Sequence, residues 1–313
     1  MRACLRPFVA ACLTFACASA AQAEPMAYAA GFDSLYRVDL ATGRATRVGD
    51  FGSLGGNALI ADVEGLALAP DGTLFGVSDS QKVLVRVNTA TGAATLVGTL
   101  REAGQPIGNE DNLDFGLAFT CDGRLWLSSD KKQRLWEIDP ATGQARSVGA
   151  TGANISGLAA RGNRLVGLGA EGTEGLYYVD RDTGAATLMA RLSPNAAFAD
   201  GGLDFDTNGN LWGVRDFFPP EGRADVFRID LANGALSGVV NVSFAAGTQD
   251  KEIETIAIAP PGACSSTNPI GPPPTGVQPG AAAVPASSPL ALTLLGALVA
   301  LVAVLALRRR AAR

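Results

Sequence analysis

The feature that most constrains this chain is a short stretch that occurs five times. Its first copy is LYRVDLATGRATRVG, at Leu35 to Gly49. The other copies are LVRVNTATGAATLVG (84–98), LWEIDPATGQARSVG (135–149), LYYVDRDTGAATLMA (176–190) and VFRIDLANGALSGVV (226–240). In each copy, apolar and polar residues alternate on both sides of a Thr-Gly or Asn-Gly pair, a pattern typical of a β-hairpin with a tight turn. Self-similarity at a fixed period indicates a repeat architecture.

A second hairpin pattern lies between these copies. It reads EGLALAPDGTLFGVSD (64–79), DFGLAFTCDGRLWLSSD (114–130), ISGLAARGNRLVGLGA (155–170) and GGLDFDTNGNLWGVRD (201–216). Two hairpins make four strands, and the turns at positions 42, 91, 142, 183 and 233 are spaced by 49, 51, 41 and 50 residues. Four-stranded units of this length are the blades of a β-propeller. We therefore predict an all-β, five-bladed propeller over residues 24–262.

The two ends of this region are expected to meet in one blade. The first copy has no inner hairpin before it, whereas IETIAIAPPG (253–262) is similar to EGLALAPDG and has no hairpin after it. We predict that residues 253–259 form the innermost strand of the first blade and close the ring. Closure would also hide two strand edges that otherwise favour aggregation.

The segments outside the propeller predict export and anchoring. Residues 1–23 combine Arg2 and Arg6, an apolar core and Ala21-Gln22-Ala23, as in a secretory signal peptide. Residues 263–289 have the Pro/Gly/Ala/Ser composition of a linker. Residues 290–307 are uncharged and long enough for a single transmembrane helix, and residues 308–313 form a basic cytoplasmic tail. This orientation places the propeller outside the inner membrane, facing the periplasm.

Charge and cysteine content narrow the partners. Residues 24–262 hold 19 basic and 30 acidic residues, a net charge of −11, which argues against binding nucleic acid.

Beyond the signal peptide the cysteines are Cys121, in an inner-hairpin turn of the third blade, and Cys264, after the closing strand of the first. Because those blades are not neighbours, we expect no disulfide between the two cysteines.

A ring of oxygen-bearing residues is the candidate site. The starts of the inner strands share one face of a propeller with its longer loops, where function usually resides. The residues expected there are Asp62, Glu64, Asn112, Asp114, Asn154, Asp200 and Glu254. Converging carboxylates and amides can hold Ca²⁺, which takes roughly six to eight oxygen ligands. The alternative is that these residues only cap turns and keep the channel mouth hydrated.

Other chemistries find little support. The chain contains no histidine, so a zinc or copper site is not expected, and neither is a Ser-His or Cys-His pair. No G-x-S-x-G motif or phosphate loop is present. Trp126, Trp136 and Trp212 fall within strands and are expected to pack between blades. The run Phe217-Phe218-Pro219-Pro220 on a long loop predicts either a partner contact or packing over the next blade.

The C-terminal segment VPASSPLALTLLGALVALVAVLALRRR resembles the bacterial sorting signals called PEP-CTERM and, more closely, IPTL-CTERM. The matching features are Val284-Pro285, Ser288-Pro289, the apolar helix and Arg308 to Arg310, although the Pro motif lacks an acidic residue and a tryptophan. The resemblance implies a Gram-negative host, recognition of the anchor by a processing protease, and passage to the cell surface or matrix. A permanent single-span anchor is the alternative.

The repeats resemble uncharacterised exported bacterial propellers and, in fold only, lactonase- and streptogramin-lyase-type propellers. Together these features predict a monomeric, membrane-anchored propeller that acts as a non-catalytic binding or surface-display module for a surface or small-molecule ligand. A Ca²⁺-dependent enzyme of the lactonase or lyase type is the alternative, and a structural component of the extracellular matrix is a third possibility. Fold similarity does not carry function.

Overall fold

The computed structural model describes residues 25–54, 59–108, 113–218, 223–246 and 252–264. The predicted signal peptide, the helix at 290–307, the tail at 308–313 and the linker beyond residue 264 lie outside the described residues. Within the described ranges, no helix has the length and apolar character needed to span a membrane.

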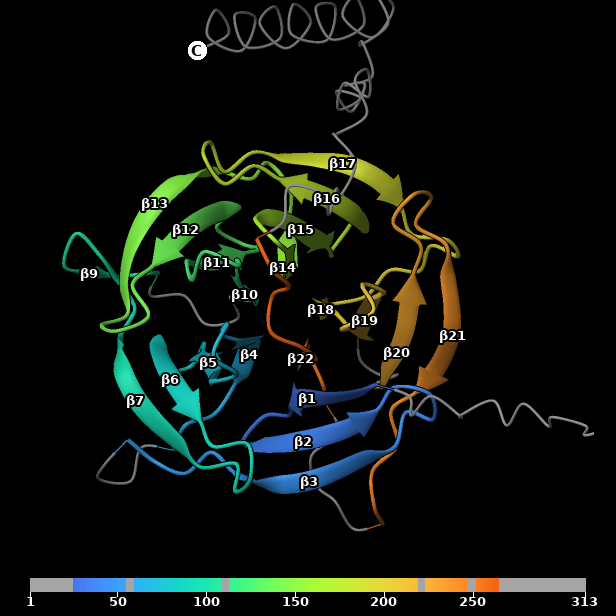
Figure 1. The fold of residues 1–313 in the computed structure, drawn as a ribbon, viewed down its shortest axis with the longest axis horizontal. Helices are drawn as coiled ribbons and strands as arrows, with labels where there is room; N and C mark the ends of the chain where they lie inside the picture. The colour runs from blue at the N-terminus through green and yellow to red at the C-terminus, as the bar shows by residue number, and fades with distance from the viewer. Residues whose placement is uncertain (1–24, 55–58, 109–112, 219–222, 247–251, 265–313) are drawn as a thin grey trace, which may run out of the picture.

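Five sheets surround a central channel, so the predicted five-bladed propeller is confirmed (Figure 1). From the channel outward, the first blade contains β22 (Thr255–Ala257), β1 (Met26–Ala30), β2 (Ser34–Asp39) and β3 (Ala45–Asp50). The second contains β4 (Val63–Leu68), β5 (Leu74–Ser78), β6 (Val83–Val87) and β7 (Ala94–Thr99). The third contains β10 (Phe115–Phe119), β11 (Leu125–Ser129), β12 (Arg134–Ile138) and β13 (Gln144–Ala150).

The last two blades follow the same plan. The fourth contains β14 (Ile155–Arg161), β15 (Arg164–Gly169), β16 (Gly175–Val179) and β17 (Ala186–Arg191). The fifth contains β18 (Asp200–Phe205), β19 (Leu211–Asp216), β20 (Ala224–Ile229) and β21 (Leu236–Asn241). A small hairpin of β8 (Arg101–Glu102) and β9 (Gln105–Pro106) extends the third sheet, because β8 pairs in parallel with β13.

The closing strand is confirmed. β22 pairs antiparallel with β1, with Tyr28 opposite Ala257 and Ala30 opposite Thr255. The regular strand is shorter than the predicted 253–259, since it begins at Thr255 and ends at Ala257. The first blade is therefore built from both ends of the described chain.

The repeated Asp-x-x-Thr-Gly pattern has a local explanation. In the first copy, Asp39 Oδ1 accepts the backbone N–H groups of Ala41 and Thr42 at 2.9 and 3.2 Å. Gly43 then adopts a φ of +70°, which a side chain would disfavour. Asn88, Asp139, Asp180 and Asp230 accept the equivalent backbone N–H in the other four blades. The repeated motif is therefore explained by the hydrogen bonds and backbone conformation that the turn requires.

A glycine repeated in the inner strands sets the width of the channel. A Cβ on Gly116 of β10 would lie 2.7 Å from the backbone nitrogen of Leu158 on β14. A Cβ on Gly202 of β18 would lie 2.8 Å from the Cα of Thr255 on β22. Neighbouring inner strands therefore approach backbone to backbone, which only glycine permits at these positions.

The apolar core is divided among the seams between blades. Each pair of adjacent blades encloses one cluster of buried side chains. Trp126, Trp136 and Trp212 are all buried within these clusters, as expected from their positions in strands. Their indole N–H groups donate to Thr120, Glu102 and Asp206 respectively.

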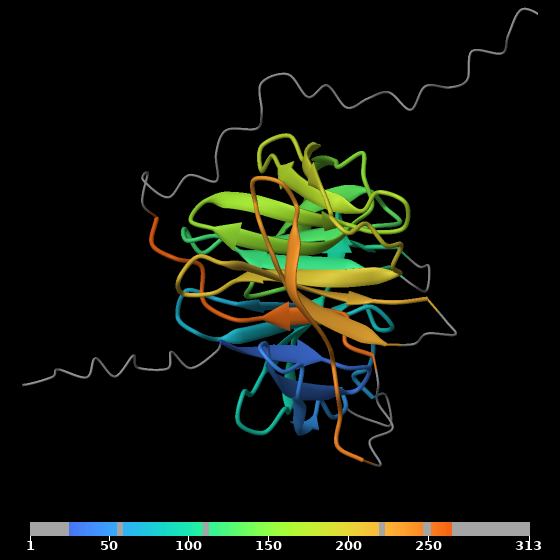
Figure 2. The same cartoon turned by 90° about the vertical axis from the view of Figure 1, so that its right-hand side faces the viewer.

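The expectation of no disulfide was wrong, because the segment after β22 does not stay in the first blade. Residues 258–264, here called the strap, cross the channel on the face that carries the short turns (Figures 1 and 2). Asp204 Oδ2 accepts the backbone N–H groups of Ile258 and Ala259 at 2.6 and 3.3 Å. Cys264 then bonds to Cys121 across a sequence separation of 143, with their Cα atoms 5.2 Å apart. The crossing brings together two blades that are not neighbours.

Candidate functional site

The channel opens on the face opposite the strap, where the inner strands begin. We call this opening the mouth. Two irregularities aim the acidic side chains of the second blade into it. Asp62 adopts a φ of +59° just before β4, and the β4–β5 register shifts between Val63 and Gly65, so that Glu64 is the extra residue of a β-bulge. Bulges re-aim side chains in this way next to functional sites.

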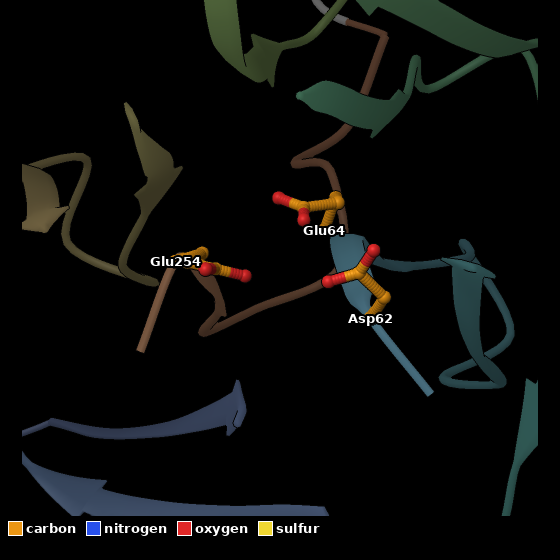
Figure 3. A group of neighbouring side chains, drawn as sticks. All are labelled: Asp62, Glu64 and Glu254. Atoms are coloured by element: carbon orange, nitrogen blue, oxygen red, sulfur yellow. The ribbon is translucent and has the colours of Figure 1, made fainter. Parts of the chain in front are cut away.

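Three of the predicted residues come together at the mouth. Asp62 and Glu64 come from the start of β4, and Glu254 comes from the segment before β22 (Figure 3). One carboxylate oxygen of each lies within 4.8 Å of the others. Glu64 is only 7% exposed, whereas Asp62 and Glu254 are partly open to solvent. We call these three side chains the carboxylate trio.

Burial and mutual repulsion raise the pKa values of the three carboxyl groups of the trio. Burial raises the pKa of Glu64 well above its ordinary value, and Glu254, Asp200, Asp114 and Asp62 add to the rise. Burial raises the pKa of Glu254 to about 8, with further contributions from the negative charges of Asp62, Glu252 and Asp216. Burial and Asp79 also raise the pKa of Asp62. A bound cation would reverse this preference by stabilising the ionised forms.

Two further predicted residues surround the trio. Asp114 lies just before β10, and burial together with neighbouring Asp130 raises its pKa to about 9. Asp200 begins β18 in the fifth blade, and burial, Glu254 and Asp114 raise its pKa well above the ordinary value. Both residues are therefore close enough to the trio to repel its charge.

The remaining two predicted residues do not join this group. Asn112 lies outside the described residues. Asn154 stands before β14 as expected, but its side-chain oxygen accepts from Gln133 at 2.8 Å and its amide donates to the Glu171 carbonyl at 3.2 Å. The amide of Asn154 is thus engaged within its own part of the ring.

Three aspartates at the mouth were missed by the sequence analysis. Asp79, Asp130 and Asp216 each occur at the end of the second strand of a blade, beside the start of the first. The signal was visible, because the inner-hairpin copies of the second, third and fifth blades all end in Asp. Two of them are neutralised, since Lys82 Nζ lies 2.7 Å from Asp79 Oδ1 and Lys131 Nζ lies 3.2 Å from Asp130 Oδ2.

The donor set of the mouth suits a hard cation. The described acidic residues offer carboxylate oxygens, with no histidine in the chain and both described cysteines in a disulfide on the opposite face. Ca²⁺ prefers such all-oxygen sites, and partly exposed ligands leave coordination positions for water or a ligand oxygen. The trio therefore fits Ca²⁺ chemically.

The two aromatic residues on the long loop of the fifth blade, Phe217 and Phe218, differ in their exposure to solvent. Phe217 is buried and lies beneath two guanidinium groups, with Arg215 and Arg223 at 4.8 and 4.3 Å from its ring centre. Phe218 is 44% exposed. Packing thus accounts for the first aromatic residue, and the second is open to a partner; Pro219 and Pro220 lie outside the described residues.

Comparison with known proteins adds fold similarity alone. No protein-family model matches the chain, and no curated protein matches it significantly in sequence. A chain of the nidogen/laminin complex is 14% identical with a TM-score of 0.48, over 75% of this chain and 98% of that one. A gluconolactonase from Xanthomonas campestris is 17% identical with a TM-score of 0.44, over 70% and 77%. Virginiamycin B lyase from Staphylococcus aureus is 15% identical with a TM-score of 0.39, over 67% and 72%. The chain spans about half the length, 53%, of two further matched structures.

Proposed function

We propose that this propeller is a Ca²⁺-dependent binding module, with the ion held by Asp62, Glu64 and Glu254 at the mouth of the channel. The observation that carries the proposal is the convergence of these three carboxylates, each with an oxygen within 4.8 Å of the others. Such proximity is unfavourable for ionised carboxylates alone and becomes favourable once a cation lies between them.

The ligand would complete the coordination of the ion. With one converging oxygen from each residue, the trio supplies fewer than the roughly six to eight oxygens that Ca²⁺ takes. The trio can therefore present the ion to hydroxyl, carboxylate or carbonyl oxygens of a surface or small-molecule ligand. Phe218 follows the end of β19, which lies beside the start of β18, so its exposed ring offers an apolar contact on the same face.

An enzyme is the second candidate, and one observation favours it. Burial raises the pKa of Asp216 to about 7, and that of Glu254 to about 8, so both carboxyl groups can exchange protons near neutral pH. A bound metal could then serve as Lewis acid, with a carboxylate as base, as in a lactonase- or lyase-type reaction. Turnover of a lactone that is lost in Glu64→Gln and in Asp114→Asn would select this alternative.

The proposal includes a location. The signal-peptide pattern of residues 1–23 and the apolar run of residues 290–307 support export from a Gram-negative cell and anchoring in the inner membrane, with the propeller facing the periplasm. Processing at the C-terminal segment would release the propeller or transfer it to the cell surface. Cell fractionation with an antibody to the propeller tests this assignment.

Thermal unfolding of the full-length chain tests the ion site. In EDTA and in millimolar Ca²⁺, a native-state site at one hundred times its Kd should differ by about 2.7 kcal/mol in unfolding free energy. For a domain of this size, each kcal/mol shifts the midpoint by about 2–4 °C. The rise should be smaller in Glu64→Gln than in the wild type. It should persist in the control Asp182→Asn, which alters an exposed aspartate in a short turn. Equal midpoints in EDTA and Ca²⁺ would refute the ion site.

A further inference from the structure

The seam between the fifth and first blades carries a second pair of carboxylates. Asp200 of β18 and Asp216 of β19 are direct cross-strand partners, so their side chains lie on the same side of the sheet. That side faces the first blade, because Trp212 and Val214, on the same face of β19, pack there in one cluster with Ile253 and Ile256. The Cβ atoms of such partners are about 4.5–5.5 Å apart.

Each of the two carboxylates has one buried oxygen without a hydrogen-bond partner among the described residues. Asp200 is 8% exposed and Asp216 is 7% exposed. Oδ1 of each is buried and makes no hydrogen bond among the described residues. Like charges directly opposite each other destabilise a sheet, and an unpaired buried charge costs several kcal/mol. Two such groups side by side therefore indicate that a positive partner completes them.

In two other blades, a lysine side chain is the positive partner of the equivalent aspartate. The equivalent aspartates of the second and third blades, Asp79 and Asp130, each have a lysine ammonium group within 3.2 Å. The fifth blade has Phe217 and Phe218 after its aspartate and no lysine among its described residues. Its arginine Arg215 faces the fourth blade, where it pairs with Asp225 at 3.3 Å and stacks on Phe217 and Phe227.

The surroundings of the pair are negative. After burial, the main influences on Asp200 are the charges of Glu254, Asp114, Asp216 and Asp130, which all raise its pKa. Glu252 acts on Asp216 in the same sense. The described residues thus supply further carboxylates to this seam in place of a counter-charge.

We propose that Asp200 and Asp216 hold a second Ca²⁺ ion, with Glu252 supplying a carboxylate from across the seam. This ion is separate from the one assigned to the carboxylate trio, and it occupies the place of the lysine ammonium groups in the second and third blades. Because Glu252–Glu254 leads directly into β22, the ion links the fifth blade to the strand that closes the ring.

Equilibrium dialysis of the full-length chain against radioactive Ca²⁺ counts the ions. The expected stoichiometry is two for the wild type and for the control Asp182→Asn. It falls to one in Asp216→Asn and one in Glu64→Gln, and to none in the double variant. Asparagine keeps the size of the side chain, and a cooperative melt confirms that each variant is folded.

The outcomes separate this inference from the proposed function. A wild type that binds one ion, lost in Glu64→Gln and kept in Asp216→Asn, overturns the second site and leaves the first; protons then neutralise the seam. A wild type that binds one ion, lost in Asp216→Asn and kept in Glu64→Gln, overturns the site at the carboxylate trio and leaves the site at the seam. No bound ion overturns both sites.

Hydrogen exchange gives a readout at the seam itself. In Glu64→Gln, where only the second ion remains, Ca²⁺ should slow exchange of the backbone amides of Thr255 to Ala257 by tenfold or more. The added protection should vanish in the double variant. Exchange in this strand that is indifferent to Ca²⁺ would contradict the proposed link between the ion and ring closure.

Discussion

At the scale of single residues, the inner-strand glycines matter as much as the acidic groups. Gly116 has no room for a side chain, because an added Cβ would lie 2.5 Å from Ser128 Oγ and 2.8 Å from the carbonyl carbon of Gly157. The adjacent Leu117 and Leu158 line the channel. A small residue at this position therefore keeps the ring narrow enough for the mouth carboxylates to meet.

Substitution of Gly116 by Ala should destabilise the propeller by about 1–3 kcal/mol, because the new methyl group forces the β10 and β14 backbones apart. Urea unfolding of the full-length chain measures the loss. Gly262→Ala is the matched control, since a Cβ there meets no atom within 4 Å. If both variants unfold at the same urea concentration as the wild type, the close backbone contact is not what limits the ring.

The residue scale is also where sequence and structure differ most. Asp62, Glu64 and Glu254 were predictable, because each begins an inner strand of a repeat whose register is known. Asp216 was not singled out, because its role depends on the cross-strand pairing with Asp200, and because no described residue of the fifth blade is a lysine that could pair with it. Asn154 was predicted as a ligand, yet its amide is engaged in local hydrogen bonds with Gln133 and Glu171.

At the scale of elements, the strap is the feature that no repeat predicts. Asp204 holds it, and this residue stands where the other inner strands have Ala67, Ala118 and Ala159. Burial raises the pKa of Asp204 to about 7, while the N–H groups of Ile258, Phe205 and Ala259 oppose the rise. A single polar residue in an otherwise apolar repeat position was therefore the available sequence signal for the strap.

Loss of the Cys121–Cys264 bond should lower the unfolding free energy by about 2–4 kcal/mol, because the bond closes a long loop in the unfolded chain. Urea unfolding with and without reductant measures this in the wild type. Cys264→Ser should unfold like the reduced wild type and should not respond to reductant. A reductant effect of equal size in both proteins would show that the stabilisation comes from elsewhere.

The failed cysteine prediction has a simple physical origin. Blade adjacency describes neighbours around the ring, whereas Cys264 reaches Cys121 across it. The composition of residues 263–289 predicts a linker that includes Ala263 and Cys264. The disulfide instead makes them part of the propeller.

At the scale of the whole molecule, one face concentrates negative charge and the other is closed by the strap. The ring itself was predictable, since five copies of one hairpin pair leave few alternatives. The grouping of the proposed ion ligands could not be predicted, because it depends on oxygens from the second and fifth blades and from the segment before β22. These are brought together only when the ring closes.

In EDTA, stability should fall as pH rises from about 5 to 9. The mouth carboxyl groups have native pKa values above their ordinary values, to about 9 for Asp114 and about 8 for Glu254. Between the unfolded and native pKa values, the native state binds more protons than the unfolded state, so deprotonation favours unfolding. Melting midpoints across this range in EDTA measure the slope.

Millimolar Ca²⁺ should flatten or reverse this slope, because the ion replaces protons as the partner of the carboxylates. The flattening should be weaker in Asp216→Asn and Glu64→Gln. A midpoint in EDTA that rises steadily over the same pH range would mean that the mouth carboxylates are already ionised and stabilised in the apo-protein.

The strap also decides how the propeller bears mechanical load. A pull on the chain beyond Cys264 reaches the disulfide first and enters the third blade through the turn between β10 and β11. Without that bond, the same force would act on β22, whose ladder to β1 contains three residue pairs. Such a ladder would peel from its end and open the ring. With the bond in place, a force applied beyond Cys264 bypasses β22, the shortest of the described inner strands, and does not act on its ladder to β1.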